Sequence, residues 1–293
     1  MVVGMDRKYL AASRLTAVGY TFRRFCLFVA CLVLVSACAG GPGVEGGSGN
    51  RVAPVALTFP ATTAEARDFP NYKNAAEAVA DSYVRVRITA PVVRPGPYGG
   101  SDPGGIITAA SGILMDTRGF VITAAHIALA VHNEAQVITR DGRVFKARIL
   151  SVDPDRELAL LRVPPFPGMR PVRISRAIDT RAGDPVFAIG TPGNRPGVVS
   201  VGRIQTPRIA ERVRYAPYSF DNGVRLDMEI EPGFSGGPLF NRKGELIGMV
   251  ASILLGDTSK ANYVSPRVAF AVPVEDIIAY LLENSERSAA FLQ

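Results

Sequence analysis

A serine enclosed by glycines, followed at once by an apolar run, is the most constraining feature of this chain. The stretch from Glu231 to Leu239 reads EPGFSGGPL. Glycine at 233 permits a turn in which the amides of Gly233 and Ser235 point at one developing negative charge. Gly236 and Gly237 leave room for a substrate backbone beside the strand that follows. The pattern predicts a nucleophilic serine with a backbone oxyanion hole, and a glycine-rich hairpin without chemistry is the alternative.

A histidine ends an apolar strand upstream of the serine. Residues 119–126 read GFVITAAH. A nucleophilic serine needs a general base, and the unperturbed pKa of histidine suits that task near neutrality. The chain has two histidines, and His132 lies in an Ala/Val-rich segment that we expect to be solvated. His126 is therefore the candidate base, with a core histidine as the alternative.

Several further motifs accompany the serine and the histidine. They are SGI at 111–113, DGRVFKA at 141–147, VFAIGTPG at 186–193, GELIG at 244–248 and AFAVP at 269–273. With these motifs, residues 75–283 resemble the HtrA/DegP branch of the trypsin-like (S1 family) serine proteases. The resemblance implies a serine endopeptidase, a hydrolase of peptide bonds. It further implies that His126 is the general base and then acid, that Ser235 is the nucleophile, and that the amides of Gly233 and Ser235 form the oxyanion hole.

The third member of the triad departs from the family pattern. Residues 151–162 read SVDPDRELALLR, and the family carries its orienting aspartate just before the Leu-Ala pair, where this chain has Glu157. Asp153 and Asp155 would face the same side as Glu157 in an extended segment. We expect Glu157 to orient His126. Asp155 in a shifted loop, or no working carboxylate at all, are the alternatives.

The order of histidine, carboxylate and serine is that of an all-β, chymotrypsin-like double antiparallel barrel, whereas α/β-hydrolases place serine before the acid and the histidine. Short apolar or alternating runs, separated by turn signals such as Asn222-Gly223, agree with that fold. We expect two helices, Asn74–Asp81 before the first barrel and Val274–Glu283 packed against the second. The expected strands are 83–88, 106–115, 119–123, 135–139, 144–150, 158–163, 185–190, 198–205, 225–230, 244–253 and 268–272.

The chain begins with features of a lipoprotein-type signal peptide. Two arginines precede thirteen uncharged residues, Phe25–Ala37, a run that is short for a membrane span. It ends in VSAC, which is similar to a bacterial lipobox and implies that Cys38 is lipidated. An ordinary secretory signal, cut one residue to either side of this cysteine, is the alternative.

A linker and one catalytic domain follow. Residues 39–50 contain six glycines, one proline and no large side chain, which predicts a flexible tether. Only 58 residues follow Ser235, so we expect no PDZ domain, a module that many HtrA-type enzymes carry. The expected parts are a signal peptide at 1–37, the lipidated cysteine and tether at 38–72, a protease domain at 73–283 with barrels at about 73–175 and 176–283, and a tail at 284–293.

Net charge and the positions of the cysteines limit which partners and cofactors the chain can have. Without the five basic and one acidic residues of 1–37, the chain has 28 basic and 25 acidic residues, a net charge of +3, which does not imply nucleic acid. Cys26, Cys31 and Cys38 all lie in the signal and its cleavage site. We therefore expect no disulfide, no metal and no cofactor. We expect polypeptide substrates and a membrane contact through the lipid on Cys38, at the bacterial outer membrane facing the periplasm, and leave a homo-oligomer open.

The strand before the serine bears on specificity. Along Asp227–Glu231, alternation places Met228 and Ile230 on one face and three acidic residues on the other. The resemblance aligns Ile230 with an apolar pocket residue, which implies small or medium aliphatic P1 residues. A competing register would put Glu229 at the pocket floor and select Lys or Arg. The substrate-binding residues implied by the resemblance are Ile230, Phe234, Ala269 and Phe270.

Glu157 separates two candidate functions. If it orients the histidine, the protein is an endopeptidase for unfolded or damaged envelope polypeptides. Without a working carboxylate, turnover would fall by roughly 10⁴, as in related triads. The protein would then be a protease-like binding or scaffold lipoprotein.

Overall fold

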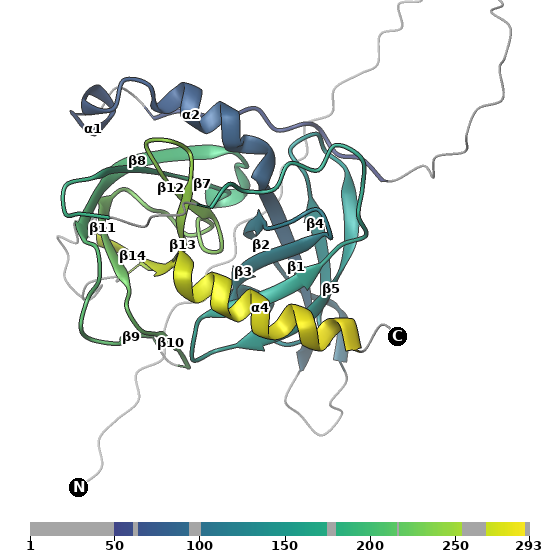
Figure 1. Ribbon diagram of the computed structural model, residues 1–293. Helices are drawn as coiled ribbons and strands as arrows, with labels where there is room; N and C mark the ends of the chain where they lie inside the picture. The colour runs from purple at the N-terminus through teal and green to yellow at the C-terminus, as the bar shows by residue number, and fades with distance from the viewer. Residues whose placement is uncertain are drawn as a thin grey trace, which may run out of the picture. The chain divides into compact units, whose positions relative to one another are not determined.

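Strand pairing in the computed structural model closes two six-stranded barrels, so the expected chymotrypsin-like double barrel is confirmed (Figure 1). The described residues belong to one compact unit, 47–293. The expected signal peptide and Cys38 lie outside them. The structure describes residues 50–60, 64–93, 101–174, 180–215, 217–253 and 268–290.

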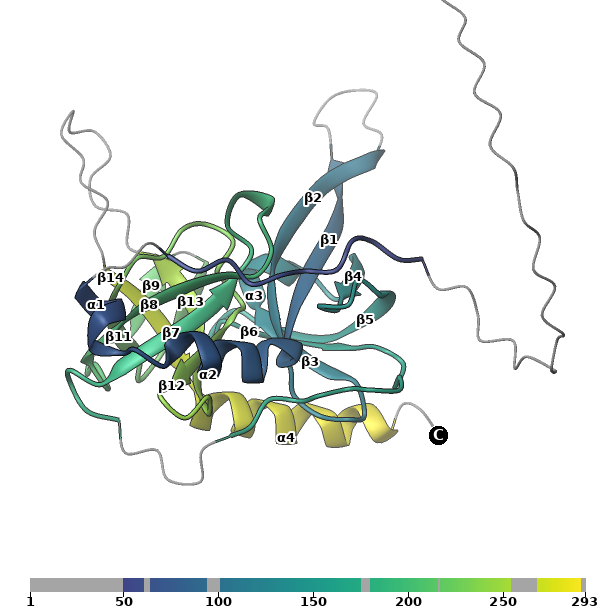
Figure 2. The same ribbon diagram turned by 90° about the horizontal axis from the view of Figure 1, so that it is seen from above.

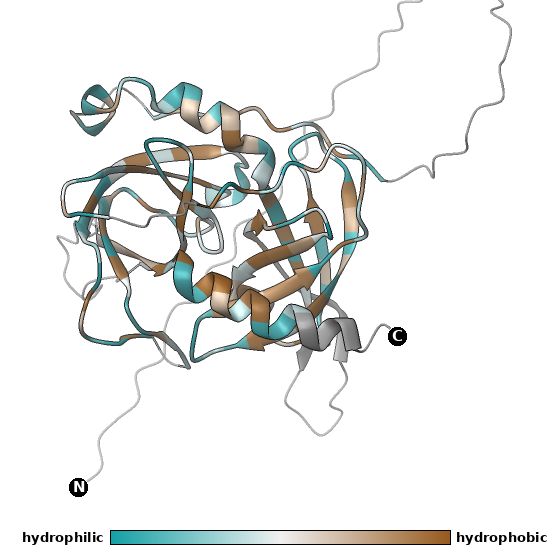
Figure 3. Ribbon diagram, in the orientation of Figure 1, coloured by the Kyte–Doolittle hydropathy of each residue, from teal (hydrophilic) through white to brown (hydrophobic). Residues whose placement is uncertain are grey.

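The first barrel has the strand order β1-β2-β3-β6-β5-β4, with every pair antiparallel. Apolar residues follow its strands, and hydrophilic residues gather at the turns (Figure 3). All five residues of β3 are buried. The strands are β1 Tyr83–Val93, β2 Ser101–Leu114, β3 Phe120–Ala124, β4 Glu134–Ile138, β5 Val144–Asp153 and β6 Leu158–Arg162.

The second barrel has the order β11-β14-β13-β12-β7-β8 and carries the glycine-rich turn between β11 and β12. A separate two-stranded sheet pairs β9 with β10. These two strands were not expected, because three residues are too few to show a periodic pattern. The strands are β7 Pro185–Gly190, β8 Val198–Thr206, β9 Val213–Tyr215, β10 Tyr218–Phe220, β11 Val224–Met228, β12 Pro238–Asn241, β13 Leu246–Ile253 and β14 Val268–Pro273.

The pairing of β3 with β6 determines where two candidate site residues of the first barrel lie. The two strands are antiparallel, with Ala124 opposite Leu158. His126 follows the end of β3, and Glu157 precedes the start of β6. The register therefore places these two side chains at the same barrel edge, although they are 31 positions apart in the chain.

Helix α4, Val274–Ala290, spans both barrels (Figure 1). It contacts β5 and β6 of the first barrel and β13 and β14 of the second, and its Tyr280 hydroxyl lies 2.7 Å from the hydroxyl of Ser151 on β5. The helix runs beyond its expected end at Glu283, so most of the expected tail is helical. The remaining helical segments are α1 Ala64–Asp68, α2 Tyr72–Val79, η1 Ala80–Ser82, α3 Ala125–Ala128 and η2 Pro192–Asn194.

Residues 50–60, which we call the strap, run across both barrels (Figure 2). The amide of Val52 donates to the carbonyl of Gly142 at 2.8 Å, in the turn between β4 and β5. The amide of Thr58 donates to the carbonyl of Gly197 at 2.8 Å, just before β8. We expected the folded domain to begin at residue 73. Among the described residues, contacts with the barrels are already present at Asn50, because backbone groups of the strap find partners on both barrels.

Candidate active site

His126 lies on the single turn of α3, directly after β3. Its neighbours Ala125 and Ile127 are buried and hold this turn against the first barrel. The imidazole side chain is 24% exposed. The rings of Tyr215 and Tyr218 meet it edge-on, with centroids 5.9 and 5.8 Å from the imidazole. The packing of α3 on the barrel and the contacts with two tyrosine rings thus hold the histidine in place.

A tight turn between β5 and β6 presents Glu157. The carboxylate of Asp153 accepts hydrogen bonds from the amides of Asp155 and Arg156, at 3.0 and 3.1 Å, which fixes the turn. Glu157 then has a φ of 57°, in the left-handed region that costs a non-glycine residue on the order of 1–3 kcal/mol. The amide of Ala125 donates to the carbonyl of Glu157 at 3.3 Å and ties this strained residue to α3.

The side chains of Glu157 and His126 are hydrogen-bonded through Oε1 and Nδ1. The glutamate side chain is fully buried. A buried carboxylate on Nδ1 favours the tautomer that carries its proton there, which leaves Nε2 able to accept a proton from a nucleophile. The second oxygen, Oε2, is buried and has no hydrogen-bond partner within the described residues.

The alternative carboxylate, Asp155, lies away from the histidine. Its side chain is 86% exposed and pairs with Arg212 at 3.3 Å. The sequence placed Asp155 on the same side as Glu157 on the assumption of an extended segment. Residues 154–157 form a turn instead, which breaks the two-residue alternation of a strand. The structure therefore brings Glu157, and not Asp155, to His126.

Ser235 lies half-buried in the turn before β12. Its hydroxyl donates to the carbonyl of Ala251 at 3.4 Å, a long distance for a hydroxyl donor, so the nucleophile is only weakly engaged. The hydroxyl of Tyr215 lies 3.4 Å from the same carbonyl and 3.5 Å from Nδ1 of His126. The amide of Ser111 donates to the carbonyl of Ser235 at 3.2 Å. Ser235 and Tyr215 thus share the carbonyl of Ala251 as an acceptor, and the same Tyr215 hydroxyl lies beside His126.

The glycines around the serine make room for the protein's own backbone. A Cβ on Gly233, where φ is 109°, would lie 2.4 Å from the carbonyl oxygen of Thr191. A Cβ on Gly236, where φ is 83°, would lie 2.2 Å from the carbonyl oxygen of Ser111, and one on Gly237 2.5 Å from a carbonyl of β7. We expected Gly236 and Gly237 to admit a substrate backbone. They instead allow the first barrel and β7 to approach the turn.

Two donors hold the carbonyl group of Gly233. The Ser111 hydroxyl lies 2.7 Å away and the Thr191 amide 3.2 Å away. The peptide that follows Gly233 is thereby held in one orientation. In the described chain, no backbone carbonyl accepts a hydrogen bond from the amide of Gly233 or of Ser235. Both amides therefore remain available to an oxyanion.

A buried polar network holds Thr191, whose amide bonds the carbonyl of Gly233, in place. The hydroxyl of Tyr83 lies 2.5 Å from that of Thr191 and accepts a hydrogen bond from the amide of Gly197 at 3.3 Å. The Thr191 hydroxyl also bonds the carbonyl of Ala110 at 3.4 Å. Burial raises the pKa of Tyr83, so its hydroxyl stays protonated. The network joins β1 and β2 to the loop that contacts Gly233, and sequence reasoning missed it because its members lie far apart in the chain.

The strand before the serine shows the expected alternation. Met228 and Ile230 are buried, whereas Asp227, Glu229 and Glu231 are exposed. Glu229 thus lies on the exposed face of this strand, and Ile230 on the buried one. The other proposed substrate-binding residues, Phe234, Ala269 and Phe270, are buried, and the Phe234 ring packs on Gly190.

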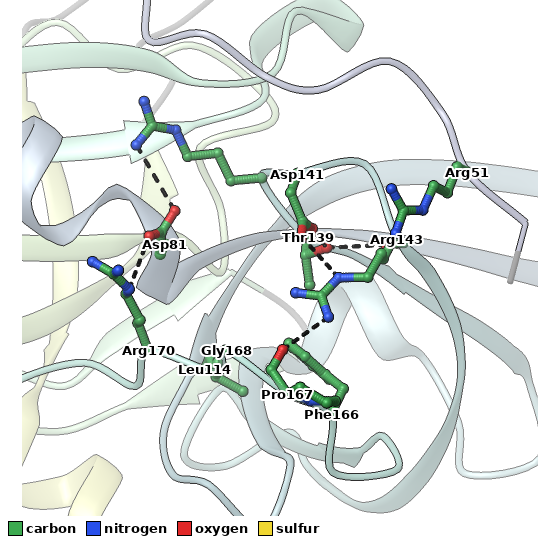
Figure 4. A pocket seen from close by; sticks show the side chains of 11 residues that line it. Arg51, Asp81, Leu114, Thr139, Asp141, Arg143, Phe166, Pro167, Gly168 and Arg170 are labelled. Carbon is green, nitrogen blue, oxygen red and sulfur yellow. Dashed lines mark hydrogen bonds and ion pairs between the residues drawn. The ribbon is translucent and has the colours of Figure 1, made fainter. Parts of the chain in front are cut away.

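A cavity of about 410 Å³ lies on the first barrel, away from these residues (Figure 4). Most of its charged side chains form ion pairs with one another. Arg143 forms an ion pair with Asp141 at 2.8 Å, and Asp81 lies 3.8 Å from Arg140 and 3.6 Å from Arg170. None of its lining residues is a candidate site residue, so the cavity is separate from the candidate active site.

A cluster of metal ligands and a membrane-spanning helix are both absent from the described ranges. Within those ranges, no three His, Cys, Asp or Glu side chains gather as metal ligands would. No helix there has both the length and the apolar character of a membrane span. The three cysteines lie outside the described residues.

Comparison with known proteins agrees with this geometry. Residues 110–249 match the family model of the trypsin-like peptidase domain. Serine endoprotease DegS of Escherichia coli K12 is 33% identical over 172 residues, which cover 58% of this chain and 46% of DegS. Mitochondrial serine protease HTRA2 of Drosophila ananassae is 30% identical over 234 residues, which cover 79% of this chain and 51% of HTRA2. The chain thus spans about half the length of these relatives.

The fold has a counterpart among solved structures. The HtrA-type protease AlgW with a decapeptide superimposes with a TM-score of 0.60 at 24% identity, over 73% of this chain and 67% of that one. This likeness concerns the fold. The sequence matches confirm the resemblance: residues 110–249 are a trypsin-like peptidase domain, and the chain is similar in sequence to the DegS and HtrA serine proteases.

Proposed function

We propose that this protein is a serine endopeptidase in which Ser235, His126 and Glu157 form the catalytic triad. The observation that carries the proposal is the hydrogen bond from His126 Nδ1 to the buried Glu157, at the barrel junction where Ser235 also lies. Relatives named as serine proteases support it.

The steps follow from the positions of these groups. His126 accepts the proton of Ser235 through Nε2 as the hydroxyl attacks a peptide carbonyl. The amides of Gly233 and Ser235 stabilise the oxyanion of the tetrahedral intermediate. His126 then donates its proton to the leaving amine, and water hydrolyses the acyl-enzyme by the same route. Glu157 stabilises the imidazolium while it exists.

The experiment is labelling with a fluorophosphonate probe, together with hydrolysis of unfolded casein. We expect the wild-type protein to be labelled and to cleave casein. Ser235→Ala should lose both properties, and His126→Ala should lose casein hydrolysis, while both variants keep the circular dichroism spectrum of the wild type. A folded Ser235→Ala variant with full activity would contradict the mechanism.

The second candidate is a protease-like binding or scaffold protein with weakened turnover. The observation in its favour is that Ser235 donates to Ala251 while Glu157 replaces the expected aspartate. This candidate predicts binding of unfolded polypeptide by wild type and Ser235→Ala alike, with no probe labelling of either.

We further propose that lipid on Cys38 anchors the protein in the bacterial envelope, at the outer membrane facing the periplasm, where it cleaves unfolded or damaged polypeptides. The VSAC sequence at Cys38 supports the lipid, and Ala39 favours the outer membrane by analogy with known sorting signals. Because the strap is attached to the barrels, the described part of the expected tether at 38–72, from Asn50 on, is not free of the protease domain.

A further inference from the structure

The hairpin of β9 and β10 is anchored to the turn that carries the glutamate of the triad. The amide of Ser219 donates to the carbonyl of Pro154 at 2.8 Å. Arg212 donates to the carbonyl of Asp155 at 2.6 Å and to the hydroxyl of Ser219 at 2.9 Å. These bonds join a hairpin that belongs to the second half of the chain to a turn of the first barrel.

The anchored hairpin brings the hydroxyl of Tyr215 beside the triad. This hydroxyl lies 3.5 Å from Nδ1 of His126 and 3.4 Å from the carbonyl oxygen of Ala251. Both distances are long for a hydroxyl, whose hydrogen bonds usually measure about 2.7–2.8 Å. Nδ1 already has Glu157 Oε1 as its partner. Neither of these two atoms is therefore a strong acceptor for the proton of the tyrosine.

The second carboxylate oxygen of Glu157, Oε2, is a hydrogen-bond acceptor that lacks a donor among the described residues. It is buried and unpartnered within the described residues, and an unpaired buried carboxylate oxygen is costly. Burial, followed by the negative charge of Glu157, raises the pKa of Tyr215. The tyrosine therefore stays protonated and able to donate.

We propose that Tyr215 is a positioning residue whose hydroxyl donates to Oε2 of Glu157 and keeps the carboxylate on His126. The inference rests on the proposed function. Glutamate has one more rotatable bond than the aspartate of the family, so one hydrogen bond to the histidine leaves its carboxylate free to rotate. A second hydrogen bond removes that freedom. The rings of Tyr215 and Tyr218 also lie against the imidazole, which limits the access of water to the pair.

The first test is kinetic and uses the full chain. Tyr215→Phe keeps the ring and removes the hydroxyl, and we expect kcat for casein or a peptide substrate to fall about 10- to 100-fold with KM nearly unchanged. Tyr280→Phe is the matched control, because it removes the hydroxyl of a buried tyrosine that bonds a side chain, Ser151, which is not a triad residue. It should leave kcat unchanged. A Tyr215→Phe enzyme as fast as the wild type would overturn the proposal.

A double-mutant cycle separates positioning from general packing. If Tyr215 acts through the carboxylate, Tyr215→Phe should cost little further activity in a Glu157→Gln background. The same loss in both backgrounds would show that Tyr215 does not act through Glu157.

A spectroscopic readout keeps the test independent of turnover. The Nδ1 proton of His126 should give a downfield proton resonance, and assignment is simple because the chain has two histidines. Tyr215→Phe should shift this resonance and Tyr280→Phe should not. An unshifted resonance in folded Tyr215→Phe would refute the positioning role. Absence of probe labelling in the wild type would instead refute the proposed function, and the resonance would still report on Tyr215.

Discussion

The hydroxyl of Ser111, on β2 of the first barrel, donates to the carbonyl oxygen of Gly233, in the serine turn of the second barrel, at 2.7 Å. This bond crosses 122 positions of sequence and fixes the peptide next to the proposed oxyanion hole. The orientation of the hole thus depends on how the two barrels dock, and the bond can be removed without touching the nucleophile.

We expect Ser111→Ala to lower kcat about 10-fold, with little change in KM. The loss should be smaller than the roughly 10²–10³ that follows removal of an oxyanion donor itself, because Ser111 acts through the peptide of Gly233. Affinity for a peptide boronic acid, which mimics the tetrahedral intermediate, should fall in parallel. Ser82→Ala is the control, since its buried hydroxyl donates to a backbone carbonyl at the same 2.7 Å, but to Val79 and not to the serine turn. Unchanged inhibitor affinity in Ser111→Ala would contradict this role.

The identity of the triad carboxylate gives the second prediction. Glu157→Gln should lower kcat by about 10²–10⁴, because it removes the charge that stabilises the imidazolium. Asp155→Asn should change kcat less than about twofold, since Asp155 is exposed and pairs with Arg212. The kcat of Glu157→Asp should lie between those of the other two variants, because the aspartate side chain is one methylene shorter and the turn is unchanged. Steady-state kinetics check all three, and a fully active Glu157→Gln enzyme would exclude Glu157.

The proposed lipid anchor can be tested by substituting Cys38. Wild-type protein should incorporate labelled fatty acid and sediment with outer membranes. Cys38→Ser should lose the label and appear in the soluble fraction or as unprocessed precursor. A mature wild-type N-terminus found at another residue, without lipid, would refute the tether.

Specificity follows from the strand before the serine. Because Ile230 is buried and Glu229 is exposed, we expect cleavage of denatured proteins mainly after small or medium aliphatic residues. Mass-spectrometric mapping of cleavage sites is the measurement. Glu229→Ala should leave the profile unchanged. Predominant cleavage after Lys or Arg that disappears in Glu229→Ala would favour the competing register.

Burial raises the pKa of Tyr280 to about 12, which gives a prediction for stability against pH. The folded state keeps this proton more tightly than the unfolded state, whose tyrosine titrates near 10. The resulting stabilisation, on the order of 2 kcal/mol, should be fully present below about pH 10 and be lost as pH rises towards 12. Urea unfolding at pH 9 and 11 measures it. Tyr280→Phe should flatten this pH dependence, and an equal slope in both proteins would contradict the assignment.

The fold class could be inferred from sequence because strands longer than three residues have a recognisable apolar pattern. Glycines mark the turns between them. The confirmed double barrel follows from that pattern and from the order of histidine, carboxylate and serine. The sheet of β9 and β10 could not be inferred, since its strands have three residues each. The docking of the strap could not be inferred either, because most of its hydrogen bonds to the barrels join backbone groups, which carry no sequence signal.

The sequence by itself determined the residue types of the site, their order and the glycines that shape the serine turn. Only the tertiary structure decided which carboxylate meets His126, because the turn at 154–157 breaks the strand alternation that would have placed Asp155 beside Glu157. It also decided the roles of Tyr215 and Ser111, whose contacts with the site cross 89 and 122 positions. Such contacts depend on how two barrels dock, and local sequence does not encode that geometry.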